Sequence, residues 1–197
     1  MITEILLFLA SASGSLPQSE SEWRDAATQA DAERLDGWKK ALEVGREGAI
    51  QGGDADMIEK RSPLFDVDAA QSNSDLPAGL YNCSITKLDG KANGGLPYIS
   101  YPRFKCRVTD VGGRKHFTKL TGSQMTIGWI YSANNEQSVY LGTLMYGYEN
   151  ALTPYGKTKE RDHASVVHRI GKDRWRMVFP YPYYESVVDV MELTPIK

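Results

Sequence analysis

Two periods of apolar residues divide the 197-residue chain. From Trp23 to Ile50, apolar side chains recur every three or four residues, as on one face of a helix. From Leu80 onward the period becomes two, and Gly, Pro and Asn interrupt it at short intervals, as in strands joined by tight turns. The pattern predicts a helical segment followed by a strand-rich body, joined near residues 73–77.

Two helices are expected in the helical segment. The first begins near Trp23, behind a serine cap, and the second runs from Ala32 to about Gly48, with Gly37 as a mild defect. The glycines at 48, 52 and 53 are interpreted as its end. Trp23 and Trp38 are interpreted as core residues that dock the helices on the body, because large aromatic side chains gain much from burial.

Eight strands are expected in the body. They are Gly79–Lys87, Pro97–Asp110, Lys115–Leu120, Met125–Ser132, Ser138–Tyr146, Ala164–Ile170, Arg174–Phe179 and Ser186–Leu193. Their hairpin-like spacing predicts an antiparallel sheet that closes or nearly closes into a barrel, because closure removes exposed edges. The expected fold is therefore α+β, with an N-terminal helical segment packed on an antiparallel, barrel-like sheet.

The charge of the chain separates at the same place. The formal net charge of −2 is the sum of −8 over residues 1–75 and +6 over residues 76–197, and all eleven tyrosines lie in the second part. We expect residues 13–75 to form an acidic helical segment, residues 76–197 to form the β-rich body, and both to fold as one unit. A net charge so close to zero argues against a nucleic-acid binder, which normally carries a strong excess of basic residues.

The first residues are typical of an export signal. The short apolar run of residues 5–9 precedes Ala10 and Ala12, the small side chains that a signal peptidase accepts. The expected signal peptide is residues 1–12, although Glu4 stands where a basic residue is usual. We therefore expect a periplasmic or otherwise exported protein. No apolar run is long enough to give the mature chain a membrane span.

The two cysteines, Cys83 and Cys106, both lie within expected strands. A single intramolecular pairing is available, and an oxidising compartment would keep it as a disulfide. The alternative is a pair of buried, reduced thiols. A metal site is not expected, because none of the three histidines has ligand spacing with a cysteine.

An ordered series of short motifs runs through the chain. It includes Gly79-x-Tyr81-x-Cys83, Phe104-x-Cys106, Lys119-Leu-Thr-Gly-Ser-Gln124, Tyr155-Gly156, Arg161-Asp162, Trp175-Arg-Met-Val-x-Pro180 and Asp189-Val-x-Glu-Leu-x-Pro195. From Trp23 to Pro195 the chain resembles an exported bacterial family, domain of unknown function 4893, of sphingomonad-type alphaproteobacteria. The resemblance implies export, a disulfide and this fold, but it implies no biochemical activity. Met125 departs from the resemblance, because a basic residue is expected there.

The most distinctive candidate for ligand binding is the turn at residues 119–124. Lys119 supplies a positive charge, while Thr121, Ser123 and Gln124 supply hydroxyl and amide groups for an anionic or sugar ligand. The alternative is a hairpin in which Gly122 adopts a positive φ and its neighbours bond their own backbone.

Further candidates lie in the second half of the body. They are Arg161, Asp162, Arg174, Arg176, Tyr181, Tyr183 and Tyr184. Arg174 and Arg176 should project from one face of a strand, as a cluster for carboxylate or phosphate or as partners of Asp189 and Glu192. The Pro-Tyr loop of residues 179–184 could line the mouth of the barrel and stack a sugar or a peptide.

Catalytic residues are not identified. A Ser-His-Asp set could be drawn from Ser123 or Ser186, His163 or His168, and Asp162 or Asp189, but no nucleophile elbow accompanies it. No cofactor is expected. The sequence favours a non-catalytic binding or interaction module of the bacterial envelope, whose partner is a small molecule or an envelope protein. The alternative is a hydrolase or transferase that acts on an envelope component.

Overall fold

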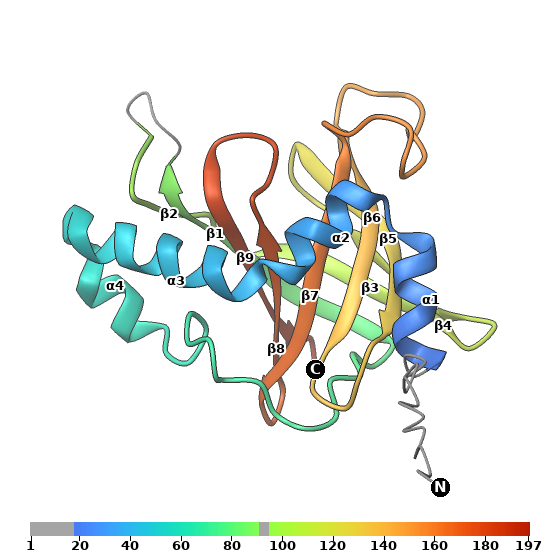
Figure 1. The fold of residues 1–197 in the computed structure, drawn as a ribbon, viewed down its shortest axis with the longest axis horizontal. Coiled ribbons are helices and arrows are strands. Elements are labelled where there is room, and N and C mark those ends of the chain that lie inside the picture. Colours follow the sequence, from blue (N-terminus) through green and yellow to red (C-terminus); the bar gives the residue numbers. More distant parts are fainter. Residues whose placement is uncertain (1–17, 91–94) are drawn as a thin grey trace, which may run out of the picture.

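The computed structural model describes residues 18–90 and 95–197, so the expected signal peptide lies outside the described residues. Within them, nine strands form one antiparallel sheet in the order β2-β1-β3-β4-β5-β6-β7-β8-β9, and pairing of β1 with β9 closes it (Figure 1). The strands are β1 Gly79–Gly90, β2 Tyr98–Ser100, β3 Phe104–Val111, β4 Arg114–Lys119, β5 Gln124–Ser132, β6 Ser138–Tyr146, β7 Asp162–Gly171, β8 Arg174–Pro180 and β9 Ser186–Pro195. The predicted antiparallel barrel is confirmed, with eight strands in the closed barrel and β2 as an addition.

The expected strand Pro97–Asp110 is wrong as a single element. Its first part is β2, which pairs with the C-terminal half of β1, and its last part is β3, which pairs with the N-terminal half of the same strand. Pro102 lies between them. A proline has no N–H to donate to a ladder, so the chain leaves the sheet there and returns further along β1.

The helices precede the barrel in the chain. They are α1 Gln18–Ala26, α2 Gln29–Asp36, α3 Trp38–Ala49, the π-helical turn η1 Ile50–Asp54 and α4 Ala55–Lys60. The expected helix Ala32–Gly48 is wrong, because Gly37 separates α2 from α3. The expected end at Gly48 is also wrong, since helical turns continue to Lys60 through Gly53, which adopts a φ of +98°.

Glycines in this region allow close packing. A Cβ at Gly45 would overlap Val188 of β9, and a Cβ at Gly52 would overlap Pro97. Gly48 faces Asp89 in the same way, with 2.7 Å from a built Cβ to the Asp89 carboxyl carbon. Gly48 and Gly52 are interpreted from the sequence as the end of the helix, but together with Gly45 they let α3 and η1 lie directly against the barrel.

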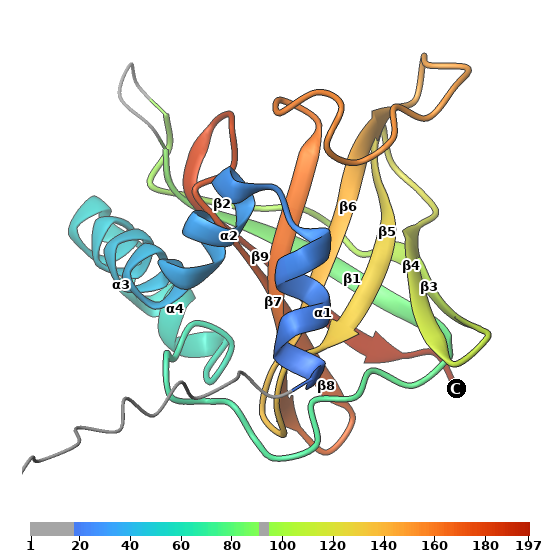
Figure 2. The same ribbon diagram turned by 45° about the vertical axis from the view of Figure 1, so that its right-hand side comes forward.

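The helices cover the outside of the barrel on one side (Figures 1 and 2). Trp23 and Trp38 are 3% and 8% exposed, and they belong to a core shared with outward-facing residues of the barrel such as Val166 and Val190. The prediction that both tryptophans are core residues is therefore confirmed. Burial of this apolar area is what holds the helical layer on the sheet.

A second core fills the inside of the barrel. Phe117, Tyr140 and Phe179 meet edge to face, with ring centroids 5.7 and 6.2 Å apart. Tyr81 and Trp175 make a similar contact at 6.2 Å. These side chains occupy the middle of the barrel, so it is a packed core rather than a deep cup.

Residues 71–77 form a strap that crosses one end of the barrel (Figure 2). The backbone N–H of Ser74 donates to the carbonyl of Asn135 at 3.1 Å, and the indole of Trp175 donates to the carbonyl of Asp75 at 3.0 Å. Leu76, 1% exposed, joins the inner core. The segment expected to be a junction between two parts therefore closes what we call the strap end.

The opposite end carries the connections at residues 95–103, 120–123, 147–161 and 181–185, and we call it the loop end. Several inward-facing residues near it, including Ile85, Phe104, Leu144 and His163, keep exposed surface. The inside of the barrel is therefore open to solvent at this end. None of the described helices is both long enough and apolar enough to span a membrane.

Candidate functional site at the loop end of the barrel

Exposed apolar side chains gather at the loop end. Of the eleven large ones that are exposed in the described chain, eight lie on its loops. They are Leu96, Tyr101, Leu120, Tyr148, Leu152, Tyr181, Tyr183 and Tyr184. A concentration of exposed apolar side chains at one end of a molecule is typical of a recognition site, whereas single exposed apolar residues are normal and need no explanation.

Helix α2 holds two of these loops in place. The Tyr155 hydroxyl donates to buried Asp31 at 2.6 Å, and Arg34 donates to the same carboxylate at 3.0 Å. The Arg34 guanidinium also donates to the carbonyls of Tyr181, at 3.1 Å, and Asp162, at 3.3 Å. The β6–β7 and β8–β9 loops are thus fixed to one helix. Sequence reasoning missed Asp31, Arg34 and Tyr155, although Tyr155 belongs to one of the motifs.

The β8–β9 loop presents its tyrosines outward. Tyr183 and Tyr184 meet edge to face at 4.6 Å and are 46% and 52% exposed. Tyr181 adopts a left-handed φ of +46°, which bends the chain at the start of the loop. Lys159, from the neighbouring β6–β7 loop, lies 5.8 Å from the ring of Tyr183.

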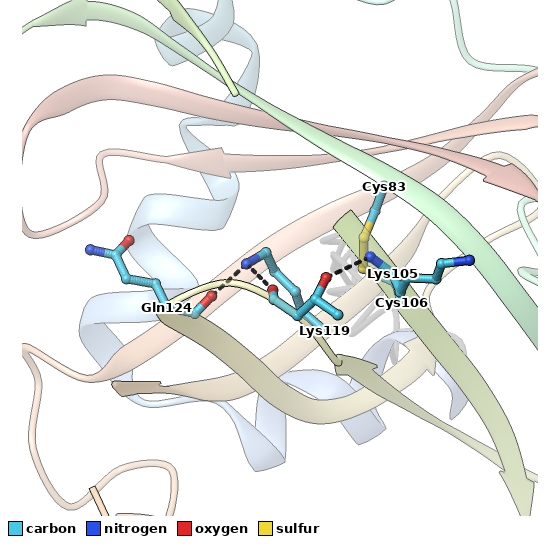
Figure 3. Close-up of a disulfide and its surroundings, with 6 residues drawn as sticks. Cys83, Lys105, Cys106, Lys119 and Gln124 are labelled. Atoms are coloured by element: carbon cyan, nitrogen blue, oxygen red, sulfur yellow. Dashed lines mark hydrogen bonds between the residues drawn. A yellow bond between two sulfur atoms is a disulfide. The ribbon is translucent and has the colours of Figure 1, made fainter. Parts of the chain in front are cut away.

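The turn between β4 and β5 uses most of its polar groups internally (Figure 3). Buried Lys119 donates to the carbonyls of Thr121, at 2.8 Å, and Gln124, at 2.7 Å. The Thr121 hydroxyl accepts from the N–H of Lys105, and Gly122 adopts a φ of +92°. For Thr121 this geometry matches the alternative given for the turn, a hairpin in which the side chain bonds backbone groups rather than a ligand.

Lys119 keeps its charge among neutral partners. Its ammonium lies 3.8 Å from the centre of the Phe104 ring, and no carboxylate of the described chain pairs with it. Burial lowers the pKa of Lys119 to about 8. The lysine therefore places positive charge at the loop end that no acidic side chain neutralises.

His163 faces the inside of the barrel just below the loops. Its ring stacks on Phe179 with centroids 4.1 Å apart, and its Nδ1 lies 2.7 Å from the hydroxyl of Thr126. Thr126 in turn lies 2.6 Å from the hydroxyl of Tyr140. Burial, together with the positive charges of Arg34, Lys87 and Lys119, lowers the pKa of His163 to about 3. The imidazole is thus neutral at physiological pH.

The two residues of the Arg161-Asp162 motif shape the β6–β7 loop. Arg161 pairs with Glu149 at 2.7 Å and covers the ring of Tyr146 at 4.2 Å. The Asp162 carboxylate accepts from the N–H of Gly156 at 2.7 Å, and burial raises its pKa. Both side chains therefore serve the loop that carries Tyr148 and Leu152.

Arg174 and Arg176 lie away from the loop end, on the outer face of the barrel. Arg174 pairs with Glu192 at 2.5 Å and donates to the carbonyls of Arg61 and Ser62 at 3.0 Å. Arg176 is fully buried and donates to the carbonyls of residues 64, 66 and 67. The two arginines fasten the chain that follows α4 to β8, so they do not form a site with the other candidates.

The other candidate residues lie on or beside the connections of the loop end. These are Lys119, Thr121, Ser123, Gln124, Arg161, Asp162, Tyr181, Tyr183 and Tyr184. Two grooves of the described chain lie elsewhere. One, of 840 Å³, borders the strap end, and the other, of 940 Å³, lies beside α3 and α4.

The Ser-His-Asp sets do not assemble in the described residues. The partner of His163 is Thr126, and the Ser186 hydroxyl donates to Asp189 rather than to a histidine. His168 lies on the outer face of the barrel, against Trp38 at 4.6 Å. Within the same residues, no group of three metal-ligating side chains converges.

The fold and this end define a class: an up-and-down antiparallel barrel with a helical layer outside and a tyrosine-bearing set of loops at its open end. Comparison with known families matches the domain of unknown function DUF4893 over residues 23–193, and the chain belongs to that family. No curated protein and no solved structure matches the chain.

Proposed function

We propose that this protein is an exported, non-catalytic binding module of the bacterial envelope, and that it recognises a protein partner through the loop end. The observation that carries the proposal is the gathering of eight exposed apolar side chains, five of them tyrosines, on the loops of one end. Tyrosine provides a large contact area and a hydroxyl at low cost in conformational entropy, and it is enriched in protein interfaces.

The construction of this end supports recognition of a surface. The loops stand on a closed barrel with a packed core, and Arg34 ties two of them to α2. Loops that a rigid scaffold positions are the usual place for binding residues. Because aromatic side chains fill the middle of the barrel, a large ligand would bind at the rim and would not be enclosed by the barrel.

Export is supported by the disulfide. Cys83 and Cys106 are bonded inside the barrel, with Cα atoms 6.0 Å apart, so the expected bridge is confirmed. Such bridges persist in oxidising compartments. We propose cleavage after Ala12, and folding of the remaining chain as one unit.

Site-specific photo-crosslinking in cells tests the function. A photoreactive phenylalanine replaces Tyr183 in one variant and Leu80, which is 42% exposed on the barrel away from the loops, in a matched control. We expect position 183 to give a discrete adduct with one envelope protein and position 80 to give none. Equal adducts at both positions, or none at position 183, would overturn the proposal.

Mass spectrometry of the same periplasmic protein tests export. The expected mass lacks residues 1–12 and two thiol hydrogens. An intact Met1 would refute the cleavage.

A further inference from the structure

Two polar groups on the inner face of β7 have no hydrogen-bond partner among the described residues. Tyr140 is buried and its hydroxyl has Thr126 as its partner, so the arrangement that satisfies every group has Tyr140 donating to Thr126 and Thr126 donating to His163 Nδ1. The proton of the neutral His163 ring then sits on Nε2. No hydrogen bond from a described residue reaches Nε2, and the ring keeps exposed surface.

Ser165 supplies the second group. It lies two residues further along β7, faces inward, and is fully buried, yet its hydroxyl has no hydrogen-bond partner in the described chain. Buried hydroxyl groups are nearly always satisfied. The His163 Nε2–H and the Ser165 hydroxyl thus lie two residues apart on the inner face of β7, and neither has a hydrogen-bond partner among the described residues.

Three cations lie near these groups: Arg34, Lys87 and Lys119. Arg34 pairs with Asp31, and Lys87 pairs with Glu185 and Asp189, so among the described residues Lys119 is the one of the three whose charge is not neutralised. The buried carboxylates at this end are already satisfied: Asp31 by Tyr155 and Arg34, Asp162 by Gly156, and Asp189 by Ser186 and Lys87. Lys119 has carbonyl partners alone, so an anion that enters here would meet unneutralised charge.

We propose that the opening of the loop end is a carboxylate-binding site, in which the partner inserts a carboxylate that accepts from His163 Nε2 and the Ser165 hydroxyl in the field of Lys119. This inference rests on the proposed function, because it names the chemistry that a partner must present at the centre of the tyrosine rim. The carboxylate comes from an acidic side chain or from a chain terminus, and both would make the same contacts.

NMR of the histidine rings tests the site with the full mature chain and small probes. N-acetylalanine supplies a terminal carboxylate, N-acetylglutamate α-amide supplies a side-chain carboxylate, and N-acetylalanine amide is the uncharged control. We expect saturable shifts of the His163 ring with at least one acid, in the millimolar range, with Nε2 protonated throughout. The pKa of His163 should rise in the complex, because the anion favours the imidazolium.

Variants separate the site from general ionic effects. Lys119→Gln keeps a donor for the turn and should weaken acid binding about tenfold, whereas Lys105→Gln, an exposed lysine on β3, should leave it unchanged. Ser165→Ala should weaken it severalfold. Equal shifts with the acids and the amide, linear shifts like those with sodium chloride, or an Nδ1-protonated ring would each overturn the site. If position 183 forms its crosslink but no acid binds, the carboxylate-binding site is wrong and the proposed function still holds.

Discussion

Buried cations in this protein are held by backbone carbonyls. Sequence reasoning offers Asp189 and Glu192 as partners for the arginines of β8, and Arg174 does pair with Glu192. Arg176 instead donates to three carbonyls of the chain after α4, while Asp189 faces into the barrel. Alternation along a strand predicts on which face of the sheet a side chain lies. Which segment of the chain covers that face is decided by the tertiary structure.

His168 makes stability depend on pH. Burial, followed by the charges of Arg176 and Lys39, lowers its pKa to about 3. A histidine whose pKa is depressed in the folded state takes up its proton in the unfolded state first, so stability falls as the pH drops below about 6.5. We expect His168 alone to remove about 2 kcal/mol between pH 8 and pH 5.

Urea unfolding at pH 8 and pH 5 measures this loss. His168→Asn keeps an acceptor for Arg176 and should lose about 2 kcal/mol less than the parent over that interval. His116→Asn serves as the comparison: burial lowers the pKa of His116 too, but this residue is only half-buried, so the variant should change the pH dependence less than His168→Asn does. An unchanged pH dependence in His168→Asn would contradict the assignment.

Helix α2 is the element that orders the loop end. Its Asp31 and Arg34 bind Tyr155, Tyr181 and Asp162, which lie 124 to 147 residues away in the chain. Arg34→Ala should destabilise the protein by about 2–4 kcal/mol, because buried Asp31 loses its cation and two carbonyls lose their donor. Amide exchange should also accelerate in the β6–β7 and β8–β9 loops, and not in the β3–β4 hairpin.

Lys115→Ala is the matched control for Arg34→Ala. Lys115 pairs with Asp110 at 2.9 Å on the β3–β4 hairpin, where the pair is partly solvated. Such pairs contribute little, so we expect a loss below about 1 kcal/mol. Similar losses and similar exchange in both variants would show that α2 has no special role.

The barrel as a whole is cross-linked by the Cys83–Cys106 bridge between β1 and β3. The two residues are 23 apart in sequence, so the bridge should stabilise the fold by about 3 kcal/mol through the unfolded chain. Cys83→Ala/Cys106→Ala should lower the free energy of unfolding by at least that amount, and a reducing agent should destabilise the parent protein and leave the variant unaffected. A parent whose stability does not change on reduction would contradict this role.

The division of charge between the two parts of the chain contributes little to their docking. Arg61, from the acidic part, pairs with Glu192 of the barrel, and Arg176 binds carbonyls of the acidic part. The shared core of Trp23, Trp38 and the valines of β7 and β9 holds the layers together. Apolar burial outweighs the attraction of surface charges that water screens.

The sequence by itself determined most strands, all but the division of residues 97–110 into β2 and β3, because alternation and turn residues act between neighbours in the chain. It also predicted the tryptophan anchors and favoured the disulfide over two reduced thiols. It placed Arg161 and the Pro-Tyr loop on connections, and Lys119 at the end of a strand. Tertiary structure alone decided that residues 71–77 close one end, that α2 fixes two loops of the other end, and that His163 and Ser165 face its opening. Each of these contacts joins residues far apart in sequence, and the closure and register of the barrel bring them together.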